Sequence, residues 1–324
     1  NLIYISLSEN EMNEELIISG RENLMVDPQL HIWHWPIPLY LFLGGLAAGV
    51  LFFAALYYLL GKEENFRTAV RRVPFLAPAA LVIGLAALFI DLRHKAYFWQ
   101  LYTTIRLESP MSWGAWTLLV ITTVSFIWCA LHIREFFPKW DWRYNWLKEL
   151  ESFFNRYKRP LAWVMLVFAI ITGVYTGILL SAFNARPLWN TSVLGPLFLA
   201  SGLSAGAASV VLASKNKHER LLFTKIDLII LGTELFLIVH MFMGFLASTQ
   251  VQIEAAGLFL GGPYTMVFWI FVVMLGIIIP AILDLMELKG YHIPAVIPGL
   301  LVIMGSLVFR FVFVFAGQVS RWLY

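Results

Sequence analysis

Hydrophobic residues in this chain are gathered into long runs, and most polar residues lie in the segments between them. Eight runs, each close to the roughly 20 residues that cross a bilayer, occupy 36–60, 74–91, 113–132, 160–182, 193–213, 226–247, 265–286 and 294–316. Lipid offers no partner for backbone N–H and C=O groups, so spans of this kind have to be helical. The pattern predicts an all-α membrane protein with eight transmembrane helices.

The composition agrees with this prediction. Of the 324 residues, 60% are hydrophobic and only 13% are charged, whereas soluble domains carry about 25% charged and 45–50% apolar residues. A water-soluble core cannot absorb so much apolar surface, so the composition excludes a soluble globular domain.

The distribution of basic residues predicts an orientation. With eight spans, 16 of the 23 lysine and arginine residues fall on one face, six fall on the other, and Arg310 lies inside a span. Because basic residues are enriched in cytoplasmic loops, both termini are expected outside. In a bacterium this means the periplasmic side of the cell inner (cytoplasmic) membrane.

A short internal repeat suggests how the spans are organised. "GLAAG" at 45–49 recurs as "GLSAG" at 202–206, four spans later and therefore in the same direction. We expect two four-helix bundles, 31–182 and 183–324, related by a parallel repeat. The spaced glycines are interpreted as helix-packing faces. Residues 1–30 lack the pattern of a cleaved signal and are interpreted as an exported N-terminal tail.

The outer connections are rich in tryptophan, tyrosine and arginine, which suit a membrane interface. They cover 91–116, 184–190 and 248–264. Together they are expected to form a platform for a partner protein, with Arg93, Trp99, Arg186 and Trp189 as candidate interface residues.

Ionisable and hydrogen-bonding side chains inside spans are costly and often mark functional sites. Depths estimated from the rise of about 1.5 Å per residue along a helix place one group of polar residues together in the outer third of the bilayer. It consists of Tyr40, Asp91, Tyr175 and Arg310, with His34 just above.

A second group of polar residues points toward the inner face. Asp227 and Glu234 are seven residues apart and share one face of their span, Asp284 lies in the inner part of the next span, and His240 lies farther out. These residues are interpreted as a possible proton path. The alternative is a structural network that ties the helices together.

The protein has no evident redox centre of its own. A single cysteine, Cys129, excludes an Fe–S cluster built from this chain alone, and no metal site is expected. Only His132 and His240 of the seven histidines lie within spans, at opposite ends, which argues against haem. A Tyr, His and Arg pocket among apolar helices is suited to a quinone, because these side chains can donate to its carbonyl groups.

These motifs resemble the NrfD/PsrC family, the membrane subunits of polysulfide reductase and related respiratory oxidoreductases. The strings that carry the resemblance, in sequence order, are "WHW", "GLAAG", "IDL", "SPMSWGAW", "YTGILLSAFNARPLWN" and "FRFVFVFAGQ". They extend over nearly the whole sequence from about residue 30 to 318.

The resemblance implies a site for menaquinone or ubiquinone on the outer side, with no haem or Fe–S cluster in this chain. It also implies a ferredoxin-like four-cluster Fe–S subunit beside it and, through that subunit, a molybdopterin catalytic subunit. By motif, Tyr175 matches the quinone-binding tyrosine of the family, Asp91 its membrane-edge acid, Arg310 its last-span arginine and His34 its entrance histidine.

The first span departs from the family pattern. Two polar quinone ligands of polysulfide reductase, an Asn and a His, align with Ile37 and Tyr40 here. Tyr40 is therefore the expected substitute donor, and the direction of electron flow is left open.

Two functions other than quinone chemistry are also compatible with the sequence. Parallel repeats and intramembrane carboxylates also occur in secondary transporters, although paired broken helices at mid-membrane are missing from the two halves. The other alternative is a proton-translocating membrane subunit without quinone chemistry.

Overall fold

The computed structural model describes residues 33–321, and the predicted exported tail at 1–30 lies outside them. It confirms eight helical spans that are long and apolar enough to cross a membrane. They are α2 (Pro36–Leu59), a second span made of η1 (Thr68–Arg72), η2 (Val73–Phe75) and α3 (Leu76–Asp91), α5 (Pro110–Leu131), α7 (Lys158–Ser181), α8 (Leu194–Ala213), α9 (Lys217–Leu246), a seventh span made of η5 (Val267–Ile278) and α11 (Ile279–Leu288), and α12 (Val296–Val319). The protein is an all-helical, multi-pass membrane protein.

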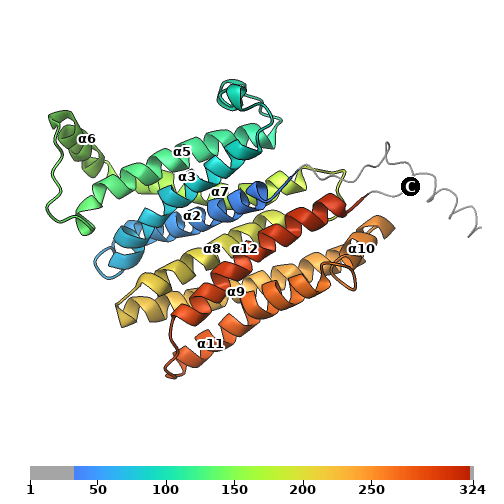
Figure 1. Cartoon of the computed structure of the whole chain (residues 1–324). Helices are drawn as coiled ribbons and strands as arrows, with labels where there is room; N and C mark the ends of the chain where they lie inside the picture. Colours follow the sequence, from blue (N-terminus) through green and yellow to red (C-terminus); the bar gives the residue numbers. More distant parts are fainter. Residues whose placement is uncertain (1–32, 322–324) are drawn as a thin grey trace, which may run out of the picture.

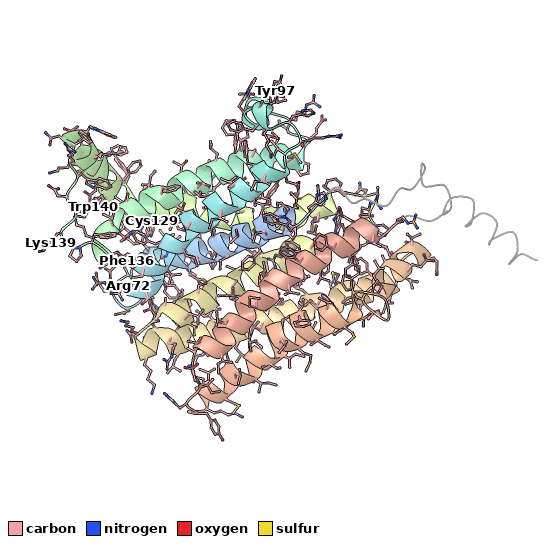
Figure 2. All side chains as sticks on the ribbon, in the orientation of Figure 1. Arg72, Tyr97, Cys129, Phe136, Lys139 and Trp140 are labelled. Atoms are coloured by element: carbon pink, nitrogen blue, oxygen red, sulfur yellow. The ribbon has the colours of Figure 1, made fainter. Side chains whose placement is uncertain are left out.

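The spans run side by side, and the two ends of the described residues lie at the same end of the bundle (Figure 1). This terminal end also carries η3 (Lys95–Tyr97), α4 (Gln100–Thr103) and α10 (Gln250–Gly257). The opposite end, here called the basic end, carries η4 (Ile133–Glu135) and the amphipathic helix α6 (Asn145–Arg156). Tyr97 marks the first end, whereas Arg72, Phe136, Lys139 and Trp140 mark the second (Figure 2). That the terminal end faces outward remains a prediction.

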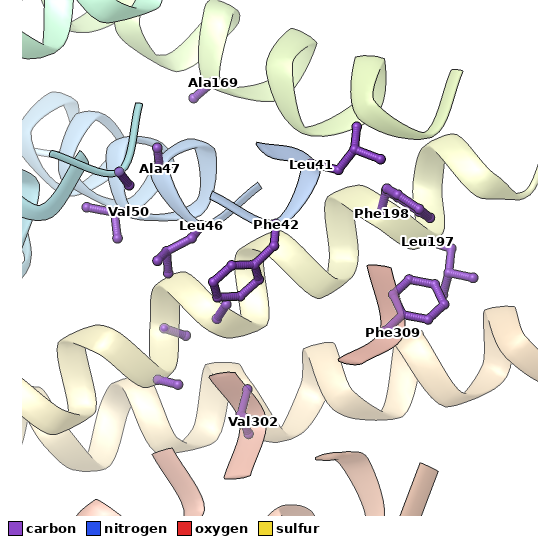
Figure 3. Packing of buried hydrophobic residues seen from close by; sticks show 14 of the residues in the cluster. Leu41, Phe42, Leu46, Ala47, Val50, Ala169, Leu197, Phe198, Val302 and Phe309 are labelled. Carbon is purple, nitrogen blue, oxygen red and sulfur yellow. The ribbon is translucent and has the colours of Figure 1, made fainter. Parts of the chain in front are cut away.

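The helix contacts fall into two rings. In the first half, α2 packs on α3 and α7, and α5 contacts both of these; in the second half, α8 packs on α9 and α12, with η5 and α11 between them. Across the halves, α2 packs on α8 and α12, and α7 packs on α8, so that their apolar side chains interdigitate at the centre (Figure 3). The division at 182/183 stays a prediction, because the two rings share this continuous core.

The repeated glycine motif forms a close backbone contact between the halves. A Cβ atom added to Gly49 would lie 2.0 Å from the carbonyl oxygen of Gly202, and one added to Gly206 would lie 2.5 Å from the carbonyl carbon of Gly49. The interpretation of these glycines as packing faces is confirmed, since the two copies of the motif pack directly against each other.

Two spans begin six or more residues earlier than the hydrophobic pattern predicts. The second starts at Thr68 because ion pairs neutralise its basic first turn: Glu135 contacts Arg67 at 2.7 Å and Arg72 at 2.8 Å. The sixth starts at Lys217, nine residues before the apolar run, because the side chain of Asn216 accepts the N–H of His218 and caps the helix.

Candidate functional site

A largely apolar cavity of about 260 Å³ lies at the terminal end of the first half. It is enclosed by α2, α3, α5, α7 and the connection that follows α3. Its lining residues are Trp33, Ile37, Tyr40, Leu85, Leu88, Asp91, Leu92, Leu101, Tyr102, Met111, Ala115, Leu118, Tyr175 and Leu179. Tyr40, Asp91 and Tyr175 thus meet in one site, as their sequence positions suggest.

Two buried phenols supply polar groups to this cavity. Tyr40 on α2 is 3% exposed and Tyr175 on α7 is 7% exposed, and their phenols lie close enough to interact with each other electrostatically. The ring of Tyr175 lies against the backbone of α5 at Gly114. Two adjacent hydroxyls in apolar surroundings can each donate a hydrogen bond to, or accept one from, a ligand between them.

Asp91 contributes a carboxyl group to the cavity wall. It ends α3 and is half-buried, and His34 lies close enough to interact with it electrostatically. His34 itself is exposed and does not line the cavity. His34 is therefore a neighbour of Asp91 at the rim, and its role as a quinone ligand stays a prediction.

Tyr102 is a cavity residue that the sequence analysis did not single out. It lies on α4, and partial burial raises the pKa of its phenol above the ordinary value. Its electrostatic influence reaches Tyr40, so three phenols share the site. In the sequence, Tyr102 belongs to the aromatic-rich connection "YFWQLY", of which only Trp99 is among the predicted site residues.

Trp33, just before α2, lines the cavity and also holds two helix ends together. The N–H of Trp33 donates to Oε1 of Gln318, and the side-chain amide of Gln318 donates to the carbonyl of Trp33, both at 2.9 Å. The Trp33 ring also stacks on Trp189, with 5.2 Å between centroids. These contacts fasten the start of α2 to the end of α12.

Arg310 is placed away from the cavity. It is fully buried between Phe198 and Phe309, and its Nη2 donates to the carbonyl of Phe198 at 2.9 Å. The predicted placement of Arg310 in the site of Tyr40 and Tyr175 is wrong, because α12 packs on α8 and its arginine lies between α8 and Gly45 of α2, outside the cavity. There it interacts electrostatically with Glu234.

A buried polar row runs through the second half from this arginine toward the basic end. Ser306 on α12 contacts Arg310 at 3.4 Å and Ser201 on α8 at 3.0 Å, and Ser201 lies beside Glu234. Asp227, about two helical turns from Glu234 on the same face of α9, accepts a hydrogen bond from Ser204 at 2.6 Å.

The row continues to the seventh span. Asp284 on α11 is buried and interacts electrostatically with both Asp227 and Glu287. Glu287 in turn pairs with Arg220 at 3.0 Å. The structure therefore brings the predicted Asp227, Glu234 and Asp284 together, and adds serines that the sequence analysis had left out.

His240 does not belong to this row. Six positions after Glu234 correspond to about 240° of turn around a helix with 3.6 residues per turn, so the imidazole lies on a different face of α9, where it is exposed and stacked on Phe236. The inclusion of His240 in the proton path is wrong for this reason.

The four candidate interface residues separate into two pairs. Arg93 and Trp99 are exposed at the terminal end, where a partner could reach them. Arg186 is 4% exposed and donates to the carbonyl of Ser320, whereas Trp189 is 1% exposed and donates to the carbonyl of Phe313. The surface role predicted for Arg186 and Trp189 is wrong, because their loop folds onto the end of α12.

Eight membrane-crossing helices and a ligand-sized cavity near one end define an integral membrane protein. Within residues 33–321, no three His, Cys, Asp or Glu side chains are grouped to hold a metal ion. The profile of the family described as "Polysulphide reductase, NrfD" matches residues 23–320. The protein belongs to this family.

Relatives of similar length are known by name. The sequence is 31% identical to Protein NrfD of Escherichia coli over 306 residues, which cover 89% of this protein and 96% of that one. It is 30% identical to a polysulfide reductase subunit of Wolinella succinogenes, over 89% and 94% of the two proteins. It is also 30% identical to the Protein NrfD homolog of Haemophilus influenzae, over 89% and 95%.

Proposed function

We propose that this protein is the quinone-reactive membrane subunit of a respiratory reductase complex. The observation that carries the proposal is that Tyr40 and Tyr175 adjoin each other inside a largely apolar cavity. Family membership supports it, since one relative is named as a part of polysulfide reductase.

The lining residues fit a quinone headgroup. Apolar residues from α2, α3, α5 and α7 provide a wall for a ring and an isoprenoid tail, and the phenols provide donors for carbonyl oxygens. A bound menaquinone or ubiquinone would supply the two-electron chemistry that the protein's own side chains lack.

The protein groups would then hold the ring and move its protons. Tyr175 and Tyr40 would donate hydrogen bonds to one carbonyl oxygen or exchange protons with it. Asp91, at the rim, would relay protons between the cavity and water, with His34 beside it.

Electrons would leave or enter through a partner at the terminal end. We propose a ferredoxin-like four-cluster Fe–S subunit on this face and, through it, a molybdopterin catalytic subunit. The exposed Arg93 and Trp99 lie on the connection that also closes the cavity, so a subunit docked there would be close to the quinone ring.

A second candidate function, proton transfer through the second half, is favoured by the buried row of carboxylates and serines. Buried carboxyl groups are expensive in a membrane unless they are paired or functional. The row extends from Arg310 near α2 to Glu287 at the basic end. We propose that it moves protons between the basic end and the middle of the membrane.

The quinone proposal is tested with Tyr175→Phe, which removes one hydroxyl and keeps the ring. Quinol turnover by the assembled complex is expected to fall by about 100-fold, the lower range for a lost proton-transfer group. Tyr97→Phe is the matched control, because Tyr97 is exposed at the tip of the same end (Figure 2). Unchanged turnover in both Tyr175→Phe and Tyr40→Phe would contradict the proposal.

A further inference from the structure

A second cavity, of about 250 Å³, lies at the basic end of the second half, far from the tyrosine site. It is formed by the first turns of α9, the last turn of α11 and the connection to α12. Its lining residues are Lys217, Arg220, Leu221, Lys225, Glu287, Leu288, Gly290, Tyr291, His292 and Ile293. Polar and apolar groups contribute almost equally to it, unlike the tyrosine cavity.

A glycine turn shapes one wall of this basic-end cavity. Gly290 has a φ of +96°, a left-handed conformation that ends α11. The N–H of Gly290 donates to the carbonyl of Glu287, and the N–H of Tyr291 donates to that of Met286. The backbone therefore folds back, and Tyr291 and His292 line the cavity opposite α9.

Three permanent cations come from a single helix. Lys217, Arg220 and Lys225 all line the cavity from the start of α9, where the helix dipole adds further positive potential. The two lysines are exposed. This wall is therefore suited to an anionic group such as a phosphate.

The cavity also contains one buried carboxylate. The side chain of Glu287 is 4% exposed, and its Oε1 lies 3.0 Å from Nε of Arg220. Within the described part of the protein, neither of its oxygens accepts a hydrogen bond. A carboxylate normally accepts several, so the site retains capacity for a hydrogen-bonding cation.

We infer that the basic-end cavity binds the headgroup of a phospholipid that carries both a phosphate and a primary ammonium group. The phosphate lies against Lys217, Lys225 and Arg220, and the ammonium donates to Glu287. Exposed apolar side chains continue along α12 from the rim, at Val296 and Ile297, and offer a surface for acyl tails. A free phosphate would bring no ammonium to the carboxylate, and a trimethylated ammonium could not donate to it.

The inference is tested on the full-length protein, purified in detergent together with the subunits that accompany it. Native mass spectrometry measures the lipid retained after exposure to equal amounts of phosphatidylethanolamine, phosphatidylglycerol or phosphatidylcholine. Two variants separate the halves of the headgroup: Lys217→Gln with Lys225→Gln for the phosphate, and Glu287→Gln for the ammonium. The control is Lys215→Gln with Lys289→Gln, two exposed lysines at the same end that do not line the cavity.

The wild-type protein is expected to retain phosphatidylethanolamine in preference to the other two lipids. Removing both lining lysines should weaken its retention by on the order of 25-fold, about fivefold for each basic group beside the headgroup, while the control pair retains it. Glu287→Gln should abolish the preference for phosphatidylethanolamine over phosphatidylglycerol. Unfolding midpoints in lipid-free detergent establish that each variant is folded.

Three results would overturn the inference. One is equal retention of all three lipids by the wild-type protein. Another is an equal loss in the control and lining-lysine variants. The third is stabilisation of the wild-type protein by inorganic phosphate alone to the same extent as by phosphatidylethanolamine, which would identify free phosphate as the ligand. None of these measurements depends on quinol turnover, so they are independent of the proposed redox function.

Discussion

Tyr175 occupies the space that a side chain at position 114 would fill. A Cβ atom added to Gly114 would lie 1.9 Å from both Cζ and Oη of Tyr175. The absence of a side chain on α5 therefore allows the phenol of α7 to reach the cavity and meet Tyr40. The motif "SPMSWGAW" thus contributes to the site through a glycine rather than through a polar group.

Gly114→Ala is expected to displace the Tyr175 ring and uncouple it from Tyr40. Quinol turnover should fall by about 100-fold, the effect of a misplacement of about 1 Å at a reacting group, while assembly of the complex is retained. Steady-state turnover with a soluble quinol analogue measures it. Gly232→Ala is the control, because a Cβ there meets no atom within 4 Å; equal effects of the two substitutions would disprove the positioning role.

Glu234→Gln is expected to interrupt the proton path while preserving the helix packing. The amide keeps the size of the side chain beside Ser201. Unlike the carboxyl group, however, it cannot take up and release a proton. Proton uptake from the basic end should slow by about tenfold or more, measured in proteoliposomes with a pH-sensitive dye. Glu149→Gln, at an exposed position of α6, should have no effect, and uptake at the wild-type rate in Glu234→Gln would rule out the path.

Gly49→Ala is expected to destabilise the contact between the two halves. Its Cβ would lie 2.0 Å from a backbone oxygen of α8, and backbone cannot rotate away as a side chain does. The free energy of unfolding should fall by about 1–3 kcal/mol, the usual cost of overpacking. Thermal unfolding in detergent measures the change. Gly244→Ala has open space around its Cβ and should be neutral or slightly stabilising; a similar loss there would mean that packing is not the cause.

The stability of the basic end should depend on pH through Glu63. A hydrogen bond with His132 and the neighbouring charges of Lys158 and Arg71 lower the pKa of this carboxyl group from 4.5 to about 2. A group with a lowered pKa stabilises the folded state above its unfolded value, and that contribution is lost as the pH falls from about 4.5 toward about 2.

Glu63→Gln should therefore lower the unfolding midpoint at neutral pH and flatten its decline over that acidic window. The midpoint is followed by intrinsic fluorescence. Glu64→Gln provides the comparison, because Glu64 pairs with the same Arg71 but is 76% exposed, so its effect should stay below about 1 kcal/mol. If the unfolding midpoint of Glu63→Gln falls as steeply as that of the wild-type protein over the acidic window, groups other than Glu63 cause the pH dependence.

The number and helical nature of the spans could be predicted from the sequence because lipid imposes both length and backbone hydrogen bonding. The convergence of Tyr40, Asp91 and Tyr175 also followed from depth along the helices. The glycine motif was informative for a similar reason, since close backbone approach leaves a readable spacing of small residues.

The direction in which each polar side chain points was decided only by the tertiary structure. In a soluble helix the apolar stripe identifies the buried face, but here lipid and core are equally apolar, so the pattern does not distinguish them. The sequence placed Arg310 and His240 at a useful depth; helix packing turned Arg310 toward Glu234 and His240 away from it. Likewise, the burial of Trp189 and the space left by Gly114 arise from contacts between segments that are distant in the sequence.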